Sequence, residues 1–566
     1  MSSSSSEADG PLVRQLLPLP VVIPLLVAAA ISAIHPLFRR RRRALDAVAI
    51  LTSGAVAGIL AAVTIASTRR DAFYWFGGFR PSHGVAIGID FAATPLAAGL
   101  ACLAAVLVTA AMVFSWRYFE RVATYYHALM LTFLAGMAGF CLTGDIFDLF
   151  VWFELMSVSA YALTAYRPEE RGPIQGALTF AITNSVGSYL TLSGIAVVYG
   201  RTGALNMAQI GHDLAGHRPD GLVVVAFVLI VTGLLVKAAI VPFQFWLADA
   251  VAVAPTPVAL LFAGVMIELG LYGVARIYWS VFSQAIGHMG AITGIFLTLG
   301  VLTAVTGALF CFRERHLKRL IAFAAMSHGG MFLIGIALLT PLGLAGSAIA
   351  VAGHALLVGA MLIGVGIVLH RLASVDETAL HGRGRVLPAT GATFAAAALG
   401  LAGLPPFATY LGTGWIVTSA VSRGLGWVIV VLVFSSALAG AAVLRVAGGV
   451  FYGLGEAPAE SPQMAMEASE ETGETVRATK RTPLTMIIPA AALTVAALSL
   501  TFLPGLGRAI ASSAARMQDQ ALYDRAVLSG PAASPDHVTP LAAGGAVSTA
   551  GDVLIGVVTA ACAIVL

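Results

Sequence analysis

The sequence predicts an all-α polytopic membrane protein with about fourteen or fifteen transmembrane helices. Hydrophobic residues make up 58% of the 566 residues and charged residues only 11%, which excludes an ordinary soluble domain. Apolar runs long enough to cross the ~30 Å hydrocarbon core of a bilayer recur along nearly the whole chain. Because backbone polar groups in lipid must be bonded within their own segment, each run is expected to form a helix.

The apolar runs follow one another with short polar connections. In the first half of the chain the expected helices cover residues 17–36, 45–67, 91–115, 123–142, 145–166, 173–198, 221–250 and 255–281. In the second half they cover 287–311, 319–340, 342–370, 387–418, 425–452 and 482–504, with a last one at 549–566.

Basic residues indicate the orientation of these helices. Five consecutive arginines, at 39–43, follow the first apolar run, so the loop that holds them is expected to be cytoplasmic. If the helices alternate from there, nineteen basic residues fall in inner loops and eleven in outer segments. This pattern predicts an outer N-terminus. Because the basic cluster follows the first run, that run is expected to be a retained helix and not a cleavable signal peptide.

Cofactor and metal sites are not expected. The four cysteines lie in or at apolar runs without paired spacing, as is typical of small core residues: Cys102, Cys141, Cys311 and Cys562. The chain has no glycine-rich nucleotide-binding loop. No cofactor, metal or nucleic acid is therefore expected to bind.

Four regions are expected along the chain. Residues 1–90 hold N-terminal transmembrane helices and an outer loop, and 91–455 form the core. Residues 456–481 are acidic, with six glutamates and no aromatic residue between 455 and 480, and are expected to be a disordered cytoplasmic linker. Residues 482–566 form C-terminal helices and an outer-side segment. Part of that segment is expected to form a surface helix around Ile510, Ala514, Met517 and Ala521.

The middle of the chain contains a short repeated motif. The segments VPFQFWL (241–247) and PPFATYL (405–411) both place Pro-Phe-x-x-x-Leu inside a long apolar run. A proline there removes a backbone hydrogen bond and breaks or kinks the helix. Two broken helices at corresponding positions are typical of transporters built from inverted repeats.

Two opposite charges lie near the centres of apolar runs, Glu154 in FDLFVWFELMSVSAYAL and Lys237 in LVKAAIVPFQFWLADA. A charge at the bilayer centre costs at least ~3 kcal/mol, so a partner and a purpose are expected. We expect the two residues to pair and a proton to change the strength of the pair. The structural alternatives are a neutral, hydrogen-bonded Glu154 and an inert ion pair that ties two helices together.

Three further titratable residues lie near the membrane midplane. Glu268 is a third midplane charge, and Arg276 is two turns away from it, too far for a contact between helical neighbours. His328 and His354 fall near the centres of two successive apolar runs. Histidine can exchange a proton near neutral pH, so these residues are candidates for a proton relay. A hydrogen-bonded core histidine is the alternative for each.

Residues nearer the helix ends have simpler interpretations. Asp148 lies one and a half turns before Glu154, toward the outer boundary, and is expected to line an entrance. His127 and Lys318 are expected to reach water by extending along the helix surface.

At these motifs the chain resembles the antiporter-like membrane subunits shared by respiratory complex I, Mrp-type cation/proton antiporters and group 4 membrane hydrogenases. The motifs are GDIFDLFVWFELMSVSAYAL, LVKAAIVPFQFWLADA with APTPVALLFAGV, RERHLKRLIAFAAMSHGG, GHALLVGAM and AGLPPFATYLG. The resemblance covers roughly residues 85–455, and the pattern is most similar to the D subunit of Mrp antiporters. It implies fourteen helices in two inverted five-helix repeats, each with a broken helix, in a prokaryotic plasma membrane.

The resemblance also implies a chain of midplane charges that moves protons or cations, with Glu154 and Lys237 at the family's glutamate and lysine. Three positions depart from the family's pattern. Glu268 stands where relatives usually have lysine, Thr413 stands where the second broken helix usually carries a charge, and Val358 replaces a common lysine. The second half is therefore short of charge, with His328 and His354 as its main titratable candidates.

The leading hypothesis is an ion-translocating subunit of a multi-subunit complex, which moves protons, or exchanges sodium for protons, along Glu154, Lys237, Glu268, His328 and His354. Its partners would be other membrane subunits of an Mrp-type, complex I-like or hydrogenase complex. Any redox chemistry would belong to the assembly. The alternative is a non-conducting structural subunit that anchors a redox or inorganic-carbon-uptake partner.

Overall fold

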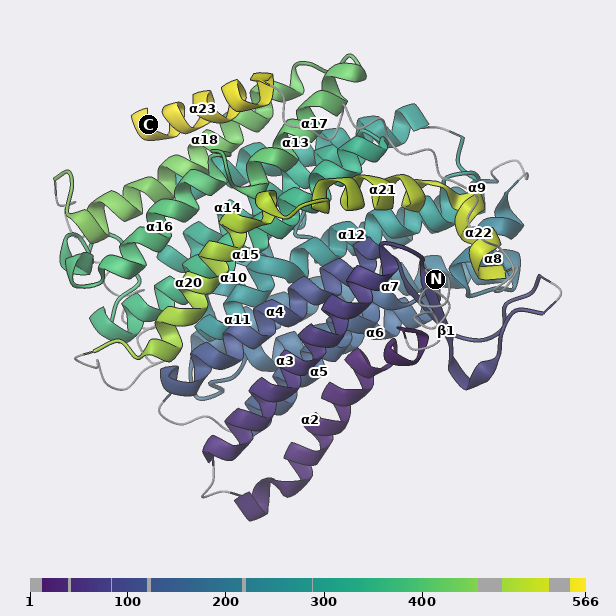
Figure 1. The fold of residues 1–566 in the computed structure, drawn as a ribbon, viewed down its shortest axis with the longest axis horizontal. Coiled ribbons are helices and arrows are strands. Elements are labelled where there is room, and N and C mark those ends of the chain that lie inside the picture. The colour runs from purple at the N-terminus through teal and green to yellow at the C-terminus, as the bar shows by residue number, and fades with distance from the viewer. Residues whose placement is uncertain are drawn as a thin grey trace, which may run out of the picture.

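The computed structural model describes residues 13–38, 42–82, 84–119, 124–215, 220–287, 289–456, 481–528 and 550–566. Within these ranges, twelve helices are long and apolar enough to cross a membrane, and three shorter apolar helices accompany them. The predicted all-α fold with about fourteen to fifteen membrane helices is confirmed (Figure 1). The two acidic and outer-side segments at 457–480 and 529–549 lie outside the described residues.

The N-terminal helices pack beside one another at one end of the molecule (Figure 1). Their bounds are α2 (Leu19–Phe38), α3 (Arg42–Ser67), α4 (Pro95–Tyr118) and α5 (Thr124–Leu142). Between α3 and α4 the chain forms a small antiparallel hairpin that the sequence did not lead us to expect. Its strands are β1 (Ala72–Trp75) and β2 (Asp90–Ala93), with the 3₁₀ turn η1 (Phe76–Gly78) after β1.

The next helices complete the first half of the core. They are α6 (Ile146–Thr164), α7 (Arg171–Thr202), the short α8 (Met207–Leu214), α9 (Gly221–Lys237) and α10 (Phe245–Val253). One continuous span then runs from Thr256 to Phe282. It contains α11 (Thr256–Leu261), the π-helical turn η2 (Phe262–Met266), α12 (Ile267–Ile277) and the π-helical turn η3 (Tyr278–Phe282). Every residue of this span except the half-buried Tyr272 is buried, so the span forms the centre of the molecule.

The second half is built from another set of long helices. They are α13 (Met289–Arg313), α14 (Leu317–Ala337), α15 (Pro341–Leu372), α16 (Pro388–Leu401), α17 (Ala408–Ser422) and α18 (Val428–Val446). The short turn η4 (Arg383–Val386) precedes α16, and the π-helical turn η5 (Ala447–Tyr452) extends α18. Helices α14 and α15 are almost completely covered by their neighbours.

Polar caps explain where several helices begin. Thr94 accepts a hydrogen bond from the backbone N–H of Ala97, and proline follows it at the first position of α4. Thr340 caps α15 in the same way, again with a proline behind it. Each threonine accepts a hydrogen bond from a backbone N–H group that would otherwise have no partner in the first turn. The helix limits therefore follow from local sequence, within a few residues of the predicted runs.

The C-terminal part lies across the helices of the core. Helix α20 (Leu484–Ser499) and the turn η7 (Leu500–Phe502) lead into α21 (Leu506–Gln518) and α22 (Gln520–Leu528). The surface helix expected around Ile510 and Met517 is present as these two pieces, and Ala514 on α21 is fully buried. Figure 1 shows α21 crossing the molecule from α20 toward α8, where α22 packs. The last helix, α23 (Ala550–Val565), packs on α18 and α17.

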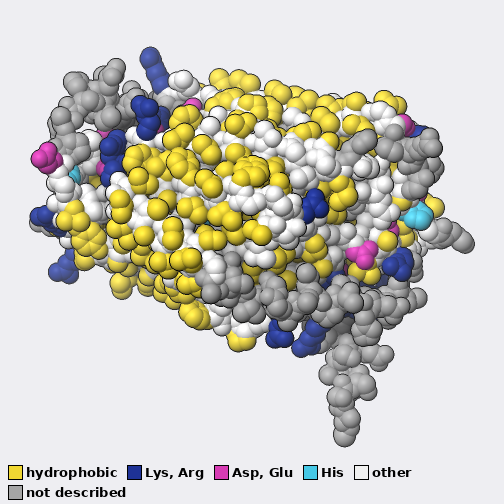
Figure 2. Space-filling model, turned by 90° about the horizontal axis from the view of Figure 1, so that it is seen from above, with side chains coloured by type: hydrophobic (Ala, Val, Ile, Leu, Met, Phe, Trp, Pro, Cys, Tyr) yellow, Lys and Arg dark blue, Asp and Glu magenta, His cyan; other side chains and the backbone are white. Residues whose placement is uncertain are grey.

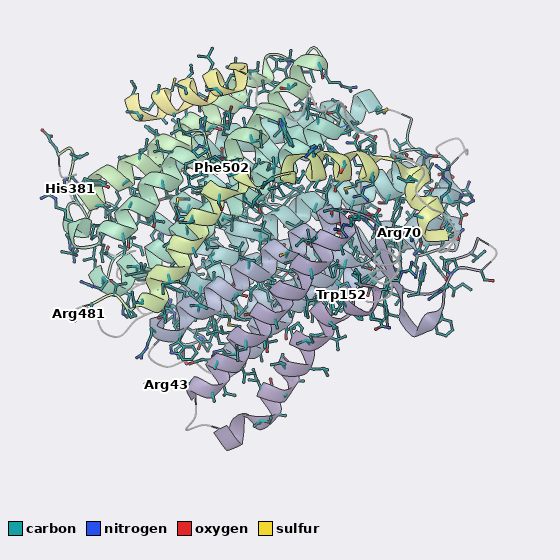
Figure 3. The ribbon with its side chains drawn as sticks, in the orientation of Figure 1. Arg43, Arg70, Trp152, His381, Arg481 and Phe502 are labelled. Carbon is teal, nitrogen blue, oxygen red and sulfur yellow. The ribbon has the colours of Figure 1, made fainter. Side chains whose placement is uncertain are left out.

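The surface separates into a hydrophobic band and two charged edges. Figure 2 shows hydrophobic side chains over the broad middle, with charged groups mainly toward two opposite ends. In Figure 3, Arg43, His381 and Arg481 lie at one end of the helices, which we call the basic edge. Arg70 lies at the opposite end, which carries β1 and β2 and which we call the hairpin edge. This distribution is typical of a multi-pass membrane protein.

Candidate functional site: buried charges beside two broken helices

The first helix break separates α9 from α10. Helix α9 ends at Lys237, and Ala239 adopts a left-handed conformation with φ 54°. The N–H of Ala239 donates to the carbonyl of Val236 (3.1 Å) and the N–H of Ile240 to that of Leu235 (3.1 Å). This turn closes the end of the helix, so Lys237 lies at the break.

The second break, between α16 and α17, repeats this turn. Gly403 has φ 73°, its N–H donates to the carbonyl of Gly400 (3.1 Å), and the N–H of Leu404 donates to that of Leu399 (3.0 Å). In this alignment Leu401 takes the place of Lys237. The matched turns are what a duplicated unit would produce. The inverted relation of two five-helix repeats stays a prediction.

Lys237 is completely buried and held by aromatic rings and a hydroxyl group. Its Nζ donates to Oγ of Ser157 over 2.6 Å. It also lies 4.8 Å from the ring centre of Phe153 and 5.9 Å from that of Phe180. These faces stabilise a cation by cation–π attraction. Lys237 is therefore placed to carry a charge without direct access to water.

Glu154 lies on α6 one turn before Ser157, but the direct pairing with Lys237 predicted from the sequence is not observed. Its Oε1 is buried without a hydrogen-bond partner among the described residues. The hydroxyl of Ser157 contacts Lys237 in place of the carboxylate, and the sequence did not point to this residue. The available signal was its spacing, because residues three apart share one face of a helix.

Glu268 and His354 form a second buried group. Oε1 of Glu268 lies 2.7 Å from Nδ1 of His354, and both side chains are fully buried. The ring of His354 stacks on that of His328, with 4.9 Å between ring centres and 20° between planes. The structure thus brings together three residues that the sequence predicted separately, from α12, α15 and α14.

His328 connects this group to the second helix break. Its Nδ1 lies 3.0 Å from the carbonyl oxygen of Ala324 and its Nε2 3.2 Å from that of Leu401. In a continuous helix the Leu401 carbonyl would accept from the residue four positions on, which is Pro405 and has no N–H. The break therefore provides the acceptor that His328 contacts.

Close packing brings the two buried groups near each other. Helix α12 lies against α9, and a Cβ at Gly270 would be only 2.7 Å from the backbone nitrogen of Ala238. Gly270 is two residues from Glu268, and Ala238 follows Lys237 directly. The glycine permits this contact because any side chain would push the helices apart.

The two positions where the resemblance implies a charge lie within the helix bundle, with Thr413 half-buried. Val358 is fully buried. Thr413 borders a small space beneath α23 that has room for about one water molecule. The residues that line this space include Ala402, Gly403, Tyr410, Ser436, Gly556 and Thr559. Neither position supplies a charge to the second half.

Two residues were wrongly predicted to extend to water. Lys318 has no exposed surface, and its Nζ donates to the carbonyls of Ala252 (3.2 Å) and Ala254 (3.0 Å) at the end of α10. The ammonium thus binds the negative end of that helix. His127 is also buried, with Nε2 2.7 Å from Oδ1 of Asp46. In both cases a distant segment supplies the partner, which residue position alone does not indicate.

Asp148 is tied into the start of α6 near the hairpin edge. Its Oδ2 accepts hydrogen bonds from Oγ1 of Thr143 (2.8 Å) and Nε1 of Trp152 (2.8 Å; Trp152 is labelled in Figure 3). Asp145 caps the same helix by accepting from the N–H groups of Phe147 and Asp148. An entrance at Asp148 stays a prediction, and its carboxylate has a local structural role.

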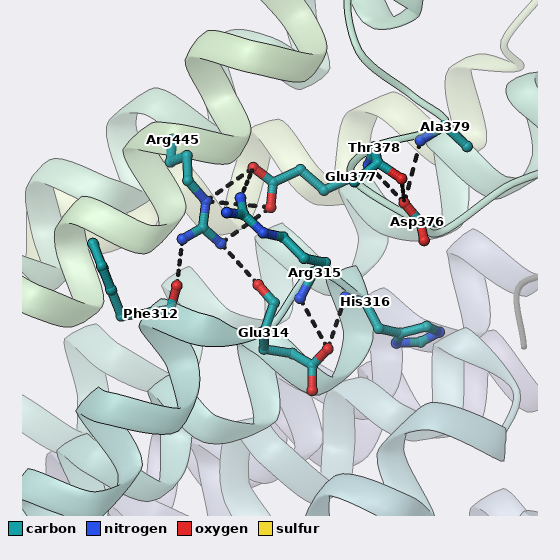
Figure 4. Close-up of polar contacts among 9 residues, drawn as sticks. All are labelled: Phe312, Glu314, Arg315, His316, Asp376, Glu377, Thr378, Ala379 and Arg445. Carbon is teal, nitrogen blue, oxygen red and sulfur yellow. Dashed lines mark hydrogen bonds and ion pairs between the residues drawn. The ribbon is translucent and has the colours of Figure 1, made fainter. Parts of the chain in front are cut away.

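At the basic edge, a clamp joins three segments (Figure 4). Glu377 accepts hydrogen bonds from Nε of Arg445 (2.9 Å) and Nη1 of Arg315 (3.1 Å). Arg445 also donates to the backbone carbonyls of Phe312 and Glu314. Because Glu377 is almost fully buried, this clamp fixes the loop after α15 to the ends of α13 and α18.

The described residues contain no group of three or more His, Cys, Asp or Glu side chains that could hold a metal ion.

The fold and the buried charges define a class of polytopic membrane protein with ionisable groups at broken helices. The sequence profile of the family described as NADH:quinone oxidoreductase/Mrp antiporter, transmembrane, matches residues 143–439. The chain belongs to this family and is an antiporter-like membrane subunit.

Individual relatives agree with this assignment. The chain is 32% identical over 434 residues to the N subunit of NADH-quinone oxidoreductase from Desulforudis audaxviator (strain MP104C), covering 75% of this chain and 84% of the relative. It is 26% identical over 498 residues to the D subunit of the Na(+)/H(+) antiporter from Bacillus subtilis (strain 168), covering 86% and 93%. Its fold matches a chain of the Mrp complex from Dietzia sp. DQ12-45-1b with a TM-score of 0.80 and 24% identity, over 91% of this chain and 99% of that one.

Proposed function

We propose that this chain moves protons across the membrane as one subunit of a larger membrane complex. The observation that carries the proposal is the buried series Glu268, His354, His328 and the Leu401 carbonyl, which reaches from α12 to the second helix break. Charged groups inside a membrane are expensive and are retained mainly for ion pathways. On this reading residues 91–455 are the translocating core.

The Glu268–His354 pair can hold a proton in two ways. With Glu268 protonated, its hydroxyl donates to Nδ1 of a neutral His354. When the proton moves across the 2.7 Å contact, a carboxylate faces an imidazolium and the total charge is unchanged. The transfer therefore requires no new net charge in the low-dielectric interior.

His328 is suited to receive a proton. A neutral imidazole carries one N–H and can donate to only one of the two carbonyls that face its nitrogens, whereas the imidazolium donates to both. The contacts with Ala324 and Leu401 therefore favour the charged ring.

The two stacked histidines hold one proton between them at a time. Two imidazolium rings 4.9 Å apart would repel each other by roughly 3 kcal/mol at an effective dielectric constant of about 20. A proton on His354 therefore makes protonation of His328 less favourable, and transfer proceeds one proton at a time.

The first half contributes Glu154 and Lys237. Protonation of Glu154 removes a negative charge near the Lys237 ammonium, which is held by Ser157 and two rings. Lys237 then gives up its proton more readily, and the packing of α12 on α9 brings this change close to Glu268. Sodium could take the place of the proton in part of the cycle.

The distribution of basic residues supports an orientation for the subunit. The basic edge faces the cytoplasm, and the hairpin edge and the N-terminus face the outside. Other membrane subunits would complete the assembly, because relatives of this chain carry the names of subunits of a quinone oxidoreductase and of an antiporter. Any electron transfer that drives transport would take place in those partners.

Substitution of Lys237 tests the proposal. We expect Lys237→Ala to abolish coupled proton movement in vesicles that contain the purified complex, while the yield of assembled complex stays near that of the wild type. Glu268→Gln should have the same effect, because glutamine cannot exchange a proton with His354. Normal transport by both variants would overturn the proposal.

A non-conducting anchoring subunit is the second candidate. The observation in its favour is that Leu401, Thr413 and Val358 supply no charge at positions where a second-half path would use one. It predicts that Lys237→Ala lowers the yield of the complex and not its coupling. Mass spectrometry of the co-purified subunits would identify the partner, whether antiporter, redox or inorganic-carbon-uptake.

A further inference from the structure

A buried polar cluster at the hairpin edge lies outside the midplane path. It consists of Arg276 at the end of α12, which contacts Tyr523 of α22, and of Asp90 of β2, whose pKa the Arg276 charge lowers. Asp90 has no exposed surface and Arg276 is only 2% exposed. A carboxylate and a guanidinium are costly to bury unless they interact with other groups, so this cluster calls for an explanation.

Asp90 is held on one side only. Its Oδ1 accepts from Nδ2 of Asn206 over 2.8 Å, while Oδ2 is buried without a hydrogen-bond partner among the described residues. A Cβ at Gly144 would lie 2.5 Å from Oδ2, so the glycine lets the carboxyl group pack against the backbone. One oxygen is thus fixed and the other is available for a proton.

Arg276 contacts Tyr523 and acts on Asp90. Its Nη2 lies 3.1 Å from the Tyr523 hydroxyl, and its guanidinium carbon lies 4.9 Å from the centre of that ring. Its Nε is buried without a partner among the described residues. Its positive charge also lowers the pKa of Asp90 and that of Asp71. The guanidinium therefore contacts α22 directly and influences the carboxylates at the hairpin through its charge.

Other charged and titratable groups face this cluster. Burial has the largest effect on the pKa of Asp90 and brings it to about 7, while Arg276 lowers it and Asp145 and Asp148, at the start of α6, raise it. Asp71 is bound to Arg516 of α21 over 3.1 Å. On α22 itself, burial raises the pKa of Asp524 to about 7, so this residue needs a control of its own.

The cluster is connected to the midplane by α12. Glu268, Tyr272 and Arg276 are spaced by four residues and share one face of this helix. The Tyr272 hydroxyl donates to the carbonyl of Cys141 over 3.0 Å. Any movement of Arg276 therefore occurs on the helix face that also carries Glu268.

We propose that Asp90 is an outer proton site that controls the midplane relay by competing with Tyr523 for Arg276. With Asp90 protonated, Arg276 holds Tyr523 and α22 is docked. When Asp90 loses its proton, the carboxylate attracts Arg276, the contact with Tyr523 weakens and α22 loosens. The control of the relay rests on the proposed function, whereas the docking change does not.

Hydrogen–deuterium exchange of residues 505–528 in the purified full-length protein tests the docking change. After correction for intrinsic rates, we expect exchange to rise about tenfold between about pH 6 and about pH 8, as proton release from a single group allows. Asp90→Asn, which mimics the protonated acid, should remain protected at both pH values. Tyr523→Phe should be less protected at about pH 6, and its corrected exchange rate should not change between the two pH values.

Asp524→Asn is the matched control, because it removes the titratable group on α22 itself. The step should persist in this variant. A wild type without a step, or a step lost in Asp524→Asn and kept in Asp90→Asn, would overturn the proposal.

Transport in vesicles separates this inference from the proposed function. Asp90→Asn should flatten the dependence of transport on outer pH without lowering its maximum. If the exchange step is present but neither the wild type nor any variant transports protons, the proposed function is wrong and the docking change is supported. If transport is normal and its pH dependence is unchanged in Asp90→Asn, the control of the relay fails.

Discussion

At the scale of single residues, hydrogen-bonding capacity decides what each buried group can do. Lys237 offers three donors, and the Ser157 hydroxyl accepts from one of them. His328 offers two ring nitrogens and faces two carbonyls. The lysine therefore relies on aromatic faces for much of its stabilisation, and the histidine on backbone oxygens, one of them freed by a helix break.

Removing the Ser157 hydroxyl should weaken the hold on Lys237. A hydrogen bond to a charged group contributes about 1.5–3 kcal/mol, so Ser157→Ala is expected to lower coupled transport by about tenfold or more. Ser157→Thr keeps the hydroxyl and should retain most of the activity. Proton uptake by vesicles measures both, and equal activity of the two variants would contradict the role given to Ser157.

The sequence identified some of these residues and missed others for a physical reason. Glu268, His328 and His354 stand out because polar groups in apolar runs are rare. Ser157 does not, since serine is common in membrane helices. Lys318 was misread because its position near a helix end is equally compatible with exposure to water. Its partners are carbonyls at the end of α10, 66 and 64 residues earlier in the chain, and only the packed fold reveals them.

At the scale of elements, the two broken helices end in the same turn with different residues. Ala239 occupies the left-handed conformation in the first break, and Gly403 occupies it in the second. Left-handed backbone costs a residue with a Cβ roughly 1–2 kcal/mol and glycine almost nothing. The first break therefore carries strain that the second avoids.

Exchanging these two residue types should change stability in opposite directions. Gly403→Ala is expected to lower the free energy of unfolding by roughly 1–2 kcal/mol. Ala239→Gly should raise it by about 0.5 kcal/mol, because relief of strain exceeds the added entropy of the unfolded chain. Thermal unfolding in detergent gives the comparison. Two changes of the same sign would show that contacts, and not φ, dominate at the breaks.

The clamp at the basic edge makes a second prediction at this scale. Glu377→Gln removes the charge shared by Arg315 and Arg445 and should cost roughly 1–3 kcal/mol, since the carboxylate is buried and both arginines are partly exposed. Glu170→Gln is the control. Its carboxylate, paired with Arg167, is 36% exposed against 7% for Glu377, so the substitution should cost less than about 0.5 kcal/mol. Similar losses in thermal stability would contradict the importance of burial.

At the scale of the whole molecule, hydropathy alone predicted the membrane spans well. All the expected runs became helices, two of them broken, with ends within a few residues of the predicted ones. The β1–β2 hairpin was missed because it consists of two strands of four residues each paired across a loop. Its place is fixed by contacts with α3, α4 and α5, which are packed together only in the folded chain.

The C-terminal helices should differ in what they contribute to the whole. Helix α23 joins a small separate cluster with Ala402 and Ala441, whereas Ala511, Ala514 and Met517 of α21 belong to the main core. Truncation after Leu528 should change the thermal midpoint little. Truncation after Phe502 should lower it strongly, because it also uncovers Arg276. Thermal unfolding of both forms tests this order, and a large loss from the first truncation would contradict it.

The stacked histidines give the proposed relay an energy scale of its own. Moving one elementary charge through a membrane potential costs about 2.3 kcal/mol per 100 mV. The mutual repulsion of roughly 3 kcal/mol between two protonated rings is thus comparable to a potential of about 130 mV. A proton that arrives on one ring could drive the proton on the other ring forward against a membrane potential of that size. The spacing of the rings would therefore set the potential against which this subunit can move protons.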